Sequence, residues 1–344
     1  MDRMQTKVKK TYNILLRIII LLTTYGFLYI KIFYGKDWHA QYLMFSSLLE
    51  KPGVKYLLLI VVFLMLVNWS IESGKWRFMI GKIERVTFLH SLQAVFAGLS
   101  ISFFTPNRTG EYVGRAFILD KASHVEGILI TILGSMSQLF ITILAGTLAL
   151  LVFIPEYMIN SRIFPDTLFF GFAFLIILMD LLLFFLLVNV QFLSVLRDKL
   201  LKFRLKKFRR HLTVFAGFSP KEMIVVMGLS TLRYIVFTGQ FFLLLKIFSV
   251  PVRLFDGILI TSLIFLALSI VPTVTITELG VRNSLAVYFF GFYFNHSAAM
   301  TVQVLDGIIL AGSLLWIINL VIPAILGTLF VFRLKFFRKN AQVI

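Results

Sequence analysis

The chain has 344 residues, of which 59% are hydrophobic and only 15% are charged. A soluble domain typically carries about 25% charged residues, so this composition excludes an ordinary soluble protein and indicates an integral membrane protein. The net charge of +18 would suggest a nucleic-acid partner in a soluble protein. Here the basic residues gather at the ends of apolar runs, as in cytoplasmic loops, so we expect no nucleic-acid partner.

Several kinds of chemistry are disfavoured by the residue inventory. Cysteine is absent, which excludes a disulfide framework, a thiol nucleophile and a thiolate metal site. The five histidines are scattered, so we expect neither a metal site nor a cofactor. No segment matches the G-x4-G-K-[ST] motif of ATP-binding loops, so direct use of ATP is not expected.

Six apolar stretches are long enough to cross about 30 Å of hydrocarbon. They cover residues 12–34, 55–74, 127–154, 167–190, 222–248 and 299–332. The first is too long for a signal peptide and lacks a small-residue cleavage site, so we expect it to remain as a span. The sequence therefore predicts an all-α integral membrane protein, with residues 1–344 in a single transmembrane domain and no soluble domain.

Two further apolar regions, 89–119 and 255–290, are each interrupted by a polar motif. With roughly 31 and 36 residues, they are too short for two complete spans and a turn. If each crossed the membrane once, the basic segment 197–210 would lie outside, against the positive-inside bias. We predict two re-entrant hairpins of opposite orientation, the first entering from the cytoplasm, with both termini cytoplasmic in a prokaryotic cytoplasmic membrane.

The two predicted hairpins carry similar polar motifs. "PNRTGEYVGR" at 106–115 and "PTVTITELGVR" at 272–282 each place a proline before a glutamate and an arginine four residues apart. Glutamate and arginine in this order share one helix face and can pair. The order span, hairpin, span occurs twice, as in transporters built from inverted repeats whose broken helices meet near the midplane. The sequence predicts a buried polar substrate site between the hairpins.

Arginine in such a site suits phosphate, because its guanidinium offers a planar fork of donors. The glutamates would orient those arginines, or bind a cationic head group or a proton. The substrate-binding candidates are Asn107, Arg108, Glu111, Arg115, Arg233, Gln240, Thr277, Glu278, Arg282 and Asn283. The alternative is that each Glu/Arg pair only neutralises itself at a tight turn, and that Arg108 reaches the interface by snorkelling.

Weaker signals lie elsewhere in the apolar segments. Asp180 and Asp306 are further candidates for the same cavity. The segment "NWSIESGKW" closes the second span, and we interpret its two tryptophans, Trp69 and Trp76, as anchors at the membrane interface.

The motifs together resemble a known family. "PNRTGEYVGR", "TELGVR", "NWSIESGKWRF" and "LRYIVFTGQFFLLLKIF" are similar to the transmembrane region of lysylphosphatidylglycerol synthases and related stand-alone flippase-like proteins, over about residues 10–335. The resemblance implies movement of a lipid with a polar or charged head group between leaflets. In bifunctional members an aminoacyl-transferase domain follows. This sequence ends at Ile344, shortly after its last span, so we do not expect synthesis of an aminoacylated lipid.

The leading hypothesis is thus a lipid flippase or transporter rather than an enzyme. Its partner would be a membrane lipid, either a phospholipid, an aminoacyl-lipid, a glycolipid or a polyprenyl-linked lipid, with or without coupling to ions or protons. One alternative is an intramembrane enzyme that acts on a lipid-linked substrate. Another is an accessory membrane subunit of a lipid-modifying enzyme. The lipid, the direction of transport and the oligomeric state stay open.

Overall fold

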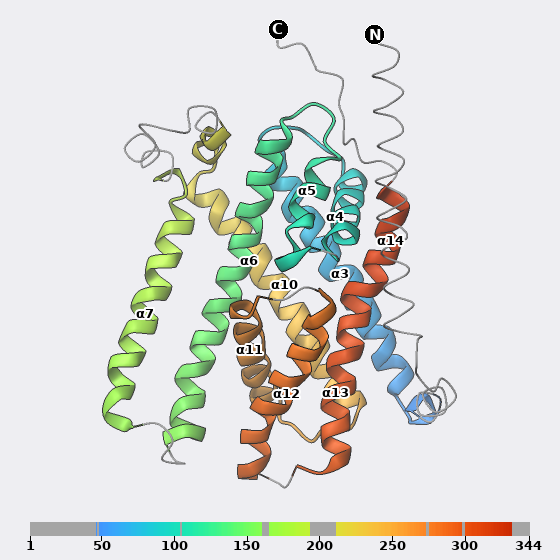
Figure 1. The fold of residues 1–344 in the computed structure, drawn as a ribbon, viewed down its shortest axis with the longest axis vertical. Coiled ribbons are helices and arrows are strands. Elements are labelled where there is room, and N and C mark those ends of the chain that lie inside the picture. The colour runs from blue at the N-terminus through green and yellow to red at the C-terminus, as the bar shows by residue number, and fades with distance from the viewer. Residues whose placement is uncertain are drawn as a thin grey trace.

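The computed structural model describes residues 46, 48–103, 105–159, 165–192, 211–272, 275–297 and 300–331, and all regular elements in these ranges are helices (Figure 1). Five of them are long and apolar enough to cross a membrane. They are α3 (Val54–Ile80), α6 with its π-helical end η3 (His124–Met158), α7 (Asp166–Val188), α10 (Pro220–Ile247), and α13, η5 and α14, which run together over Val302–Val331. These five helices agree with five of the six predicted spans, and predicted span 12–34 lies outside the described residues.

The two predicted hairpin segments fold as pairs of shorter helices. In the first hairpin, α4 (Phe88–Ser102) packs against α5 (Gly110–Ala116), with the 3-10 turn η2 (Pro106–Arg108) between them. In the second hairpin, α11 (Leu254–Ile270) packs against α12 (Thr275–Ser297), which runs past the predicted end at residue 290. The hairpins occupy opposite halves of the molecule, and their turns approach each other at mid-height (Figure 1).

Local sequence explains the tight turn of the first hairpin. Asn107 and Arg108 adopt left-handed backbone angles, with φ of 49° and 56°. The Thr105 hydroxyl accepts a 2.7 Å hydrogen bond from the amide of Gly110, the first residue of α5. A Cβ atom on Gly114 of α5 would lie 2.6 Å from the Gly98 Cα atom of α4. Glycine is therefore required where the two helices pack together.

Helix packing follows the same pattern in both halves of the chain. Helix α3 packs against α10, α4 packs against α14, and α11 packs correspondingly against α6. Helix α5 contacts α6 as α12 contacts α13. The contacts of α3 with α4 and α6 likewise correspond to those of α10 with α11 and α13, and the contact of α4 with α5 corresponds to that of α11 with α12. Among the described helices α7 has no counterpart, and it lies at the side of the molecule, against α6 and α10 (Figure 1).

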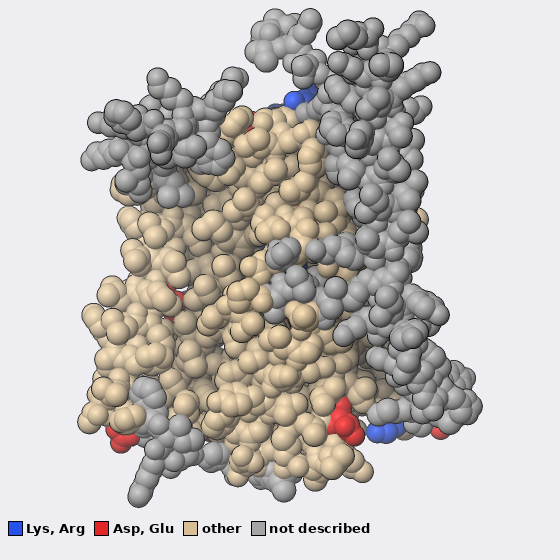
Figure 2. All heavy atoms as spheres, viewed as in Figure 1, with Lys and Arg blue, Asp and Glu red and all other residues tan. Residues whose placement is uncertain are grey.

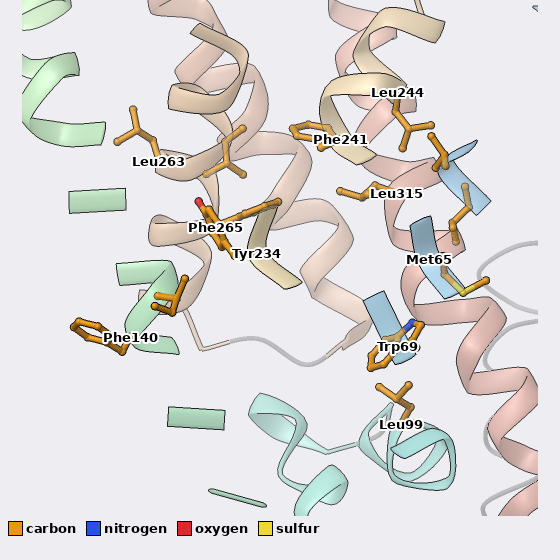
Figure 3. Packing of buried hydrophobic residues seen from close by; sticks show 14 of the residues in the cluster. Met65, Trp69, Leu99, Phe140, Tyr234, Phe241, Leu244, Leu263, Phe265 and Leu315 are labelled. Carbon is orange, nitrogen blue, oxygen red and sulfur yellow. The ribbon is translucent and has the colours of Figure 1, made fainter. Parts of the chain in front are cut away.

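Hydrophobic side chains form both the interior and the outer surface. Tyr234 of α10 and Phe265 of α11 lie together in the core, with ring centroids 6.2 Å apart (Figure 3). On the outside, the described residues of the face shown in Figure 2 include almost no charged side chain between the two ends of the molecule. Helix α7 exposes large apolar residues such as Phe170 and Phe174. This distribution is typical of a multi-pass membrane protein.

The interpretation of Trp69 and Trp76 as interface anchors is wrong. Both side chains are buried, and the Trp76 indole donates a 3.0 Å hydrogen bond to the Thr131 hydroxyl of α6. The reason is that α3 does not end at residue 74 but continues to Ile80. The segment that carries the tryptophans therefore lies inside a packed helix.

Candidate functional site

The two hairpins are joined by an ion pair at their turns. Arg108 of the first hairpin donates a 2.6 Å hydrogen bond to Oε2 of Glu278 in α12. The other oxygen of Glu278, Oε1, accepts a 2.5 Å bond from Arg282, one helical turn further along α12. The predicted pair Glu278 and Arg282 is confirmed, and the same carboxylate also holds Arg108 from the opposite half of the molecule.

A second ionic cluster lies behind the first hairpin and centres on Glu72 of α3. This carboxylate, whose side chain is 4% exposed, pairs with Arg115 at 2.7 Å, Lys75 at 2.9 Å and Arg233 at 3.0 Å. Arg115 also pairs with Glu111, as the four-residue spacing predicted. Buried charges are tolerated only when they are paired, so the Glu72 carboxylate is required to compensate three cations.

Arg233 of α10 and Asn68 of α3 extend this cluster toward η5. The Arg233 Nε donates a 3.0 Å hydrogen bond to the Asn68 side chain, and the Arg233 guanidinium lies 5.0 Å from the centre of the Trp69 ring. Asn68 in turn donates to Asn319 of η5 at 3.3 Å. Polar contacts thus continue from α3 to α10 and η5 through the middle of the molecule.

A central cavity of ≈ 530 Å³ lies between these groups. Its volume is within the range of about 300–1,000 Å³ that is usual for small-molecule sites. Its polar lining includes Asn68, Asn107, Arg108, Tyr112, Gln138, Arg233, Glu278, Arg282 and Asn319. Among the charged side chains that line it, three are arginines and one is a carboxylate, which leaves a formal excess of two positive charges. The cavity therefore favours an anionic ligand.

Arg282 has the strongest requirement for a further partner. Its side chain is only 5% exposed and lies near the rings of Phe237 and Phe265, at 5.8 and 5.9 Å. One terminal nitrogen bonds Glu278, while Nε and Nη1 have no hydrogen-bond partner within the described part of the chain. A buried unsatisfied donor costs about 1–3 kcal/mol, and more when it is charged. Oxygen atoms of an anionic group in the cavity would satisfy both nitrogens.

The structure brings together only part of the predicted site. Five candidates line the central cavity, namely Asn107, Arg108, Arg233, Glu278 and Arg282. Glu111 and Arg115 lie behind it in the Glu72 cluster.

The remaining candidates lie outside the cavity lining. Gln240 donates a 2.8 Å hydrogen bond to the Val61 carbonyl and joins α10 to α3. Asn283 donates to the Ser313 hydroxyl at 3.1 Å and joins α12 to α13. Thr277 is exposed near the start of α12. Asp180 accepts a 2.8 Å bond from Thr147 and joins α7 to α6, and Asp306 is exposed.

Sequence reasoning did not find Glu72 and Lys75 as members of the ionic network. Lys75 is buried, and its ammonium lies 3.4 Å from both the Gly134 carbonyl and the Ser230 hydroxyl. Their spacing of three residues within α3 was the available signal, because two opposite charges inside an apolar helix are expected to pair. It was missed because α3 was predicted to end at residue 74.

Comparison with known families identifies most of the chain. The family model described as "Lysylphosphatidylglycerol synthase TM region" matches residues 14–318. The chain belongs to this family. The family match covers both hairpins and the Glu72 cluster, which confirms the resemblance, and membership indicates a membrane protein linked to lipid synthesis or lipid flipping. No curated protein and no solved structure matched the chain.

Proposed function

We propose that this member of the lysylphosphatidylglycerol synthase transmembrane family is a lipid flippase. The head group of an anionic lipid would occupy the central cavity while its acyl chains stay in the bilayer. The observation that carries the proposal is Arg282, a buried guanidinium in the cavity wall with two unpartnered nitrogens. Arg108 and Arg233 line the same cavity and would supply further donors for a phosphate group.

Within this proposal, the two hairpins are re-entrant, enter from opposite membrane faces and belong to an inverted repeat. The matching contacts of α3 to α6 and α10 to α14 support this arrangement. Broken helices are tolerated at membrane depth where they line a polar cavity, and both hairpin turns contribute residues to the cavity.

The proposed orientation places both termini in the cytoplasm of a prokaryotic cell. The ends of α3, α7 and α14 and the starts of α6 and α10 lie at one end of the molecule (Figure 1). In the sequence, these ends adjoin the basic segments 77–85, 197–210 and 333–339, whereas Lys75 is buried in the Glu72 cluster. Positively charged segments favour the cytoplasmic side, which supports this orientation.

Glu278 would hold the site together between transport events. It neutralises Arg108 and Arg282 at once. A phosphate group offers the same kind of oxygen acceptors to both arginines, and it would compete with the Glu278 carboxylate for them. Binding of the head group would thereby weaken the Arg108–Glu278 ion pair between the two hairpins. The hairpins could then separate, which passage of the lipid across the membrane requires.

Purified protein in liposomes tests the proposal. The liposomes contain a trace of tail-labelled phosphatidylglycerol or, separately, tail-labelled phosphatidylcholine, and a membrane-impermeant reductant reports the label in the outer leaflet. We expect the protein to expose inner-leaflet phosphatidylglycerol to the reductant faster than phosphatidylcholine, with empty liposomes as the control. If the protein speeds the exchange of neither lipid, flipping of common phospholipids is contradicted. That result would favour an intramembrane enzyme or an accessory subunit of a lipid-modifying enzyme.

A further inference from the structure

The central cavity has an apolar rim on one side. Met136 and Leu139 of α6 and Ile270 and Val271 at the end of α11 line the cavity, and all four are also exposed. The cavity is thus bordered, between α6 and the turn of the second hairpin, by apolar side chains that reach the outer surface of the molecule. In a membrane protein, such side chains contact lipid.

Helix α6 contributes both kinds of lining over about two turns. Ser135, Gln138 and Thr142 form a polar strip, while Met136 and Leu139 stand beside it. The Gln138 amide nitrogen donates to the Ser230 carbonyl at 3.3 Å, and its buried amide oxygen has no hydrogen-bond partner among the described residues. A polar strip next to an exposed apolar strip matches the two parts of a phospholipid, its head group and its acyl chains.

The equivalent place in the other half of the molecule is closed. Phe103 follows α4 directly, as Val271 follows α11. Phe103 is 2% exposed, whereas Val271 is 40% exposed. The Phe103 ring packs on Trp316 with centroids 6.0 Å apart, and Leu320 and Val321 complete this apolar cluster. The cavity is therefore bordered by exposed apolar residues at the second hairpin and sealed by packed side chains at the first.

We infer that the side of the cavity bordered by α6 and the end of α11 is a lateral portal that holds the acyl chains of an anionic phospholipid. The portal is formed by Met136, Leu139, Ile270 and Val271. The physical reason is that acyl chains are stable only in hydrocarbon, while the charged head group requires the polar cavity. A lipid can satisfy both conditions at once only where the cavity meets the bilayer sideways. The inference rests on the proposed function and assigns the side from which the lipid enters.

Site-specific quenching tests the portal, and the absence of native cysteine allows each label to be unique. Leu139→Cys and Ile270→Cys place a fluorophore at the portal in two separate proteins. Phe174→Cys places the same fluorophore on the exposed face of α7, away from the cavity, as the matched control. Each labelled protein is reconstituted with phosphatidylglycerol or phosphatidylcholine that carries bromine on its acyl chains, because bromine quenches a fluorophore in contact with it.

At both portal positions we expect brominated phosphatidylglycerol to quench at least about threefold more effectively than the brominated choline lipid, since charge-assisted hydrogen bonds retain the anionic head group. The α7 label should respond equally to the two lipids. Arg282→Ala and Arg108→Ala are each introduced separately into the Leu139→Cys protein. Either substitution should abolish the stronger quenching by brominated phosphatidylglycerol. Equal quenching by both lipids at both portal positions overturns the portal.

The flipping assay separates failure of the portal from failure of the proposed function. If the unlabelled protein flips phosphatidylglycerol but the portal labels show no preference, the portal is wrong and the flippase proposal stands. If the preference is present without flipping, the portal stands as a lipid site and the flippase proposal fails.

Discussion

Arg108 and Glu278, which are 170 positions apart in the sequence, form a 2.6 Å hydrogen-bonded ion pair that links the turns of the two hairpins. The pair brings the polar motif of each half of the chain to one cavity. It also places Arg108 in contact with the carboxylate that holds Arg282. The contact is therefore the direct structural link between the two halves of the candidate site.

A double-mutant cycle with Arg108→Ala and Glu278→Ala measures this link. We expect a coupling of about 1 kcal/mol or more in the free energy of unfolding, because directly paired charges do not contribute independently. The measurement is unfolding of the two single variants and the double variant in mixed detergent micelles. Strictly additive effects would show that the pair contributes nothing to the stability of the fold.

Replacement of Glu72 by glutamine should be strongly destabilising. Glu72→Gln leaves Lys75, Arg115 and Arg233 without their shared carboxylate, and breaking a buried ion pair costs about 3–5 kcal/mol. Glu222→Gln is the control, because Glu222 pairs with Lys82 but its side chain is 28% exposed. An exposed pair contributes about 1 kcal/mol at most. Equal losses of unfolding free energy in the two variants would contradict the central role of Glu72.

The glycine contact inside the first hairpin gives a packing prediction. Gly114→Ala would push a methyl group against Gly98 and force α4 and α5 apart, at a cost of about 1–3 kcal/mol in unfolding free energy. Gly228→Ala is the matched control in α10, because a Cβ atom there has no neighbour within 4 Å. That change should be neutral or stabilising, since alanine favours a helix by up to about 1 kcal/mol over glycine. Unchanged stability of Gly114→Ala would show that the hairpin is loosely packed.

A pH-dependent contact lies outside the membrane-spanning helices, at Glu84 between α3 and α4. Burial acts to raise the pKa of Glu84, but hydrogen bonds of 2.7–2.9 Å from the backbone amides of Ala122, Asp120 and Lys121 outweigh it and lower the pKa below 4.5. A lowered folded-state pKa means that the ionised carboxylate stabilises the fold above pH 4.5. This stabilisation is lost as the pH falls through the folded-state value.

Thermal unfolding of the wild type and of Glu84→Gln, measured from pH 7 downward, checks that folding lowers the pKa of Glu84. The wild type should have the higher unfolding temperature near neutral pH, and the difference should shrink once the pH falls below 4.5. A difference that stays constant or grows in acid would contradict the assignment.

The long helices could be predicted because length and hydropathy are sufficient to recognise a membrane span. The pairs Glu111/Arg115 and Glu278/Arg282 could be predicted because residues four apart always share a helix face. Both kinds of inference use local sequence alone. Local sequence is therefore sufficient to predict the hairpins and the ion pairs within them.

The partners across the fold could not be predicted in this way. A charge in an apolar segment indicates a buried polar contact, but it does not distinguish a ligand from another side chain. Arg115 was predicted to contact phosphate, yet it pairs with Glu72 and Glu111 behind the cavity. Arg108 was weighed as a snorkelling residue, yet it pairs with Glu278. Both outcomes depend on contacts between distant parts of the chain, which have no local pattern.

The most direct test of the central claim is the flipping rate of Arg282→Ala for phosphatidylglycerol in liposomes. The control is Arg253→Ala, because Arg253 is an exposed arginine directly before α11 that does not line the cavity. We expect Arg282→Ala to lower the rate at least about tenfold, since hydrogen bonds to a charged group contribute about 1.5–3 kcal/mol, and Arg253→Ala to keep the wild-type rate. A correctly folded Arg282→Ala protein that flips the lipid at the wild-type rate would contradict a head-group site between the two hairpins.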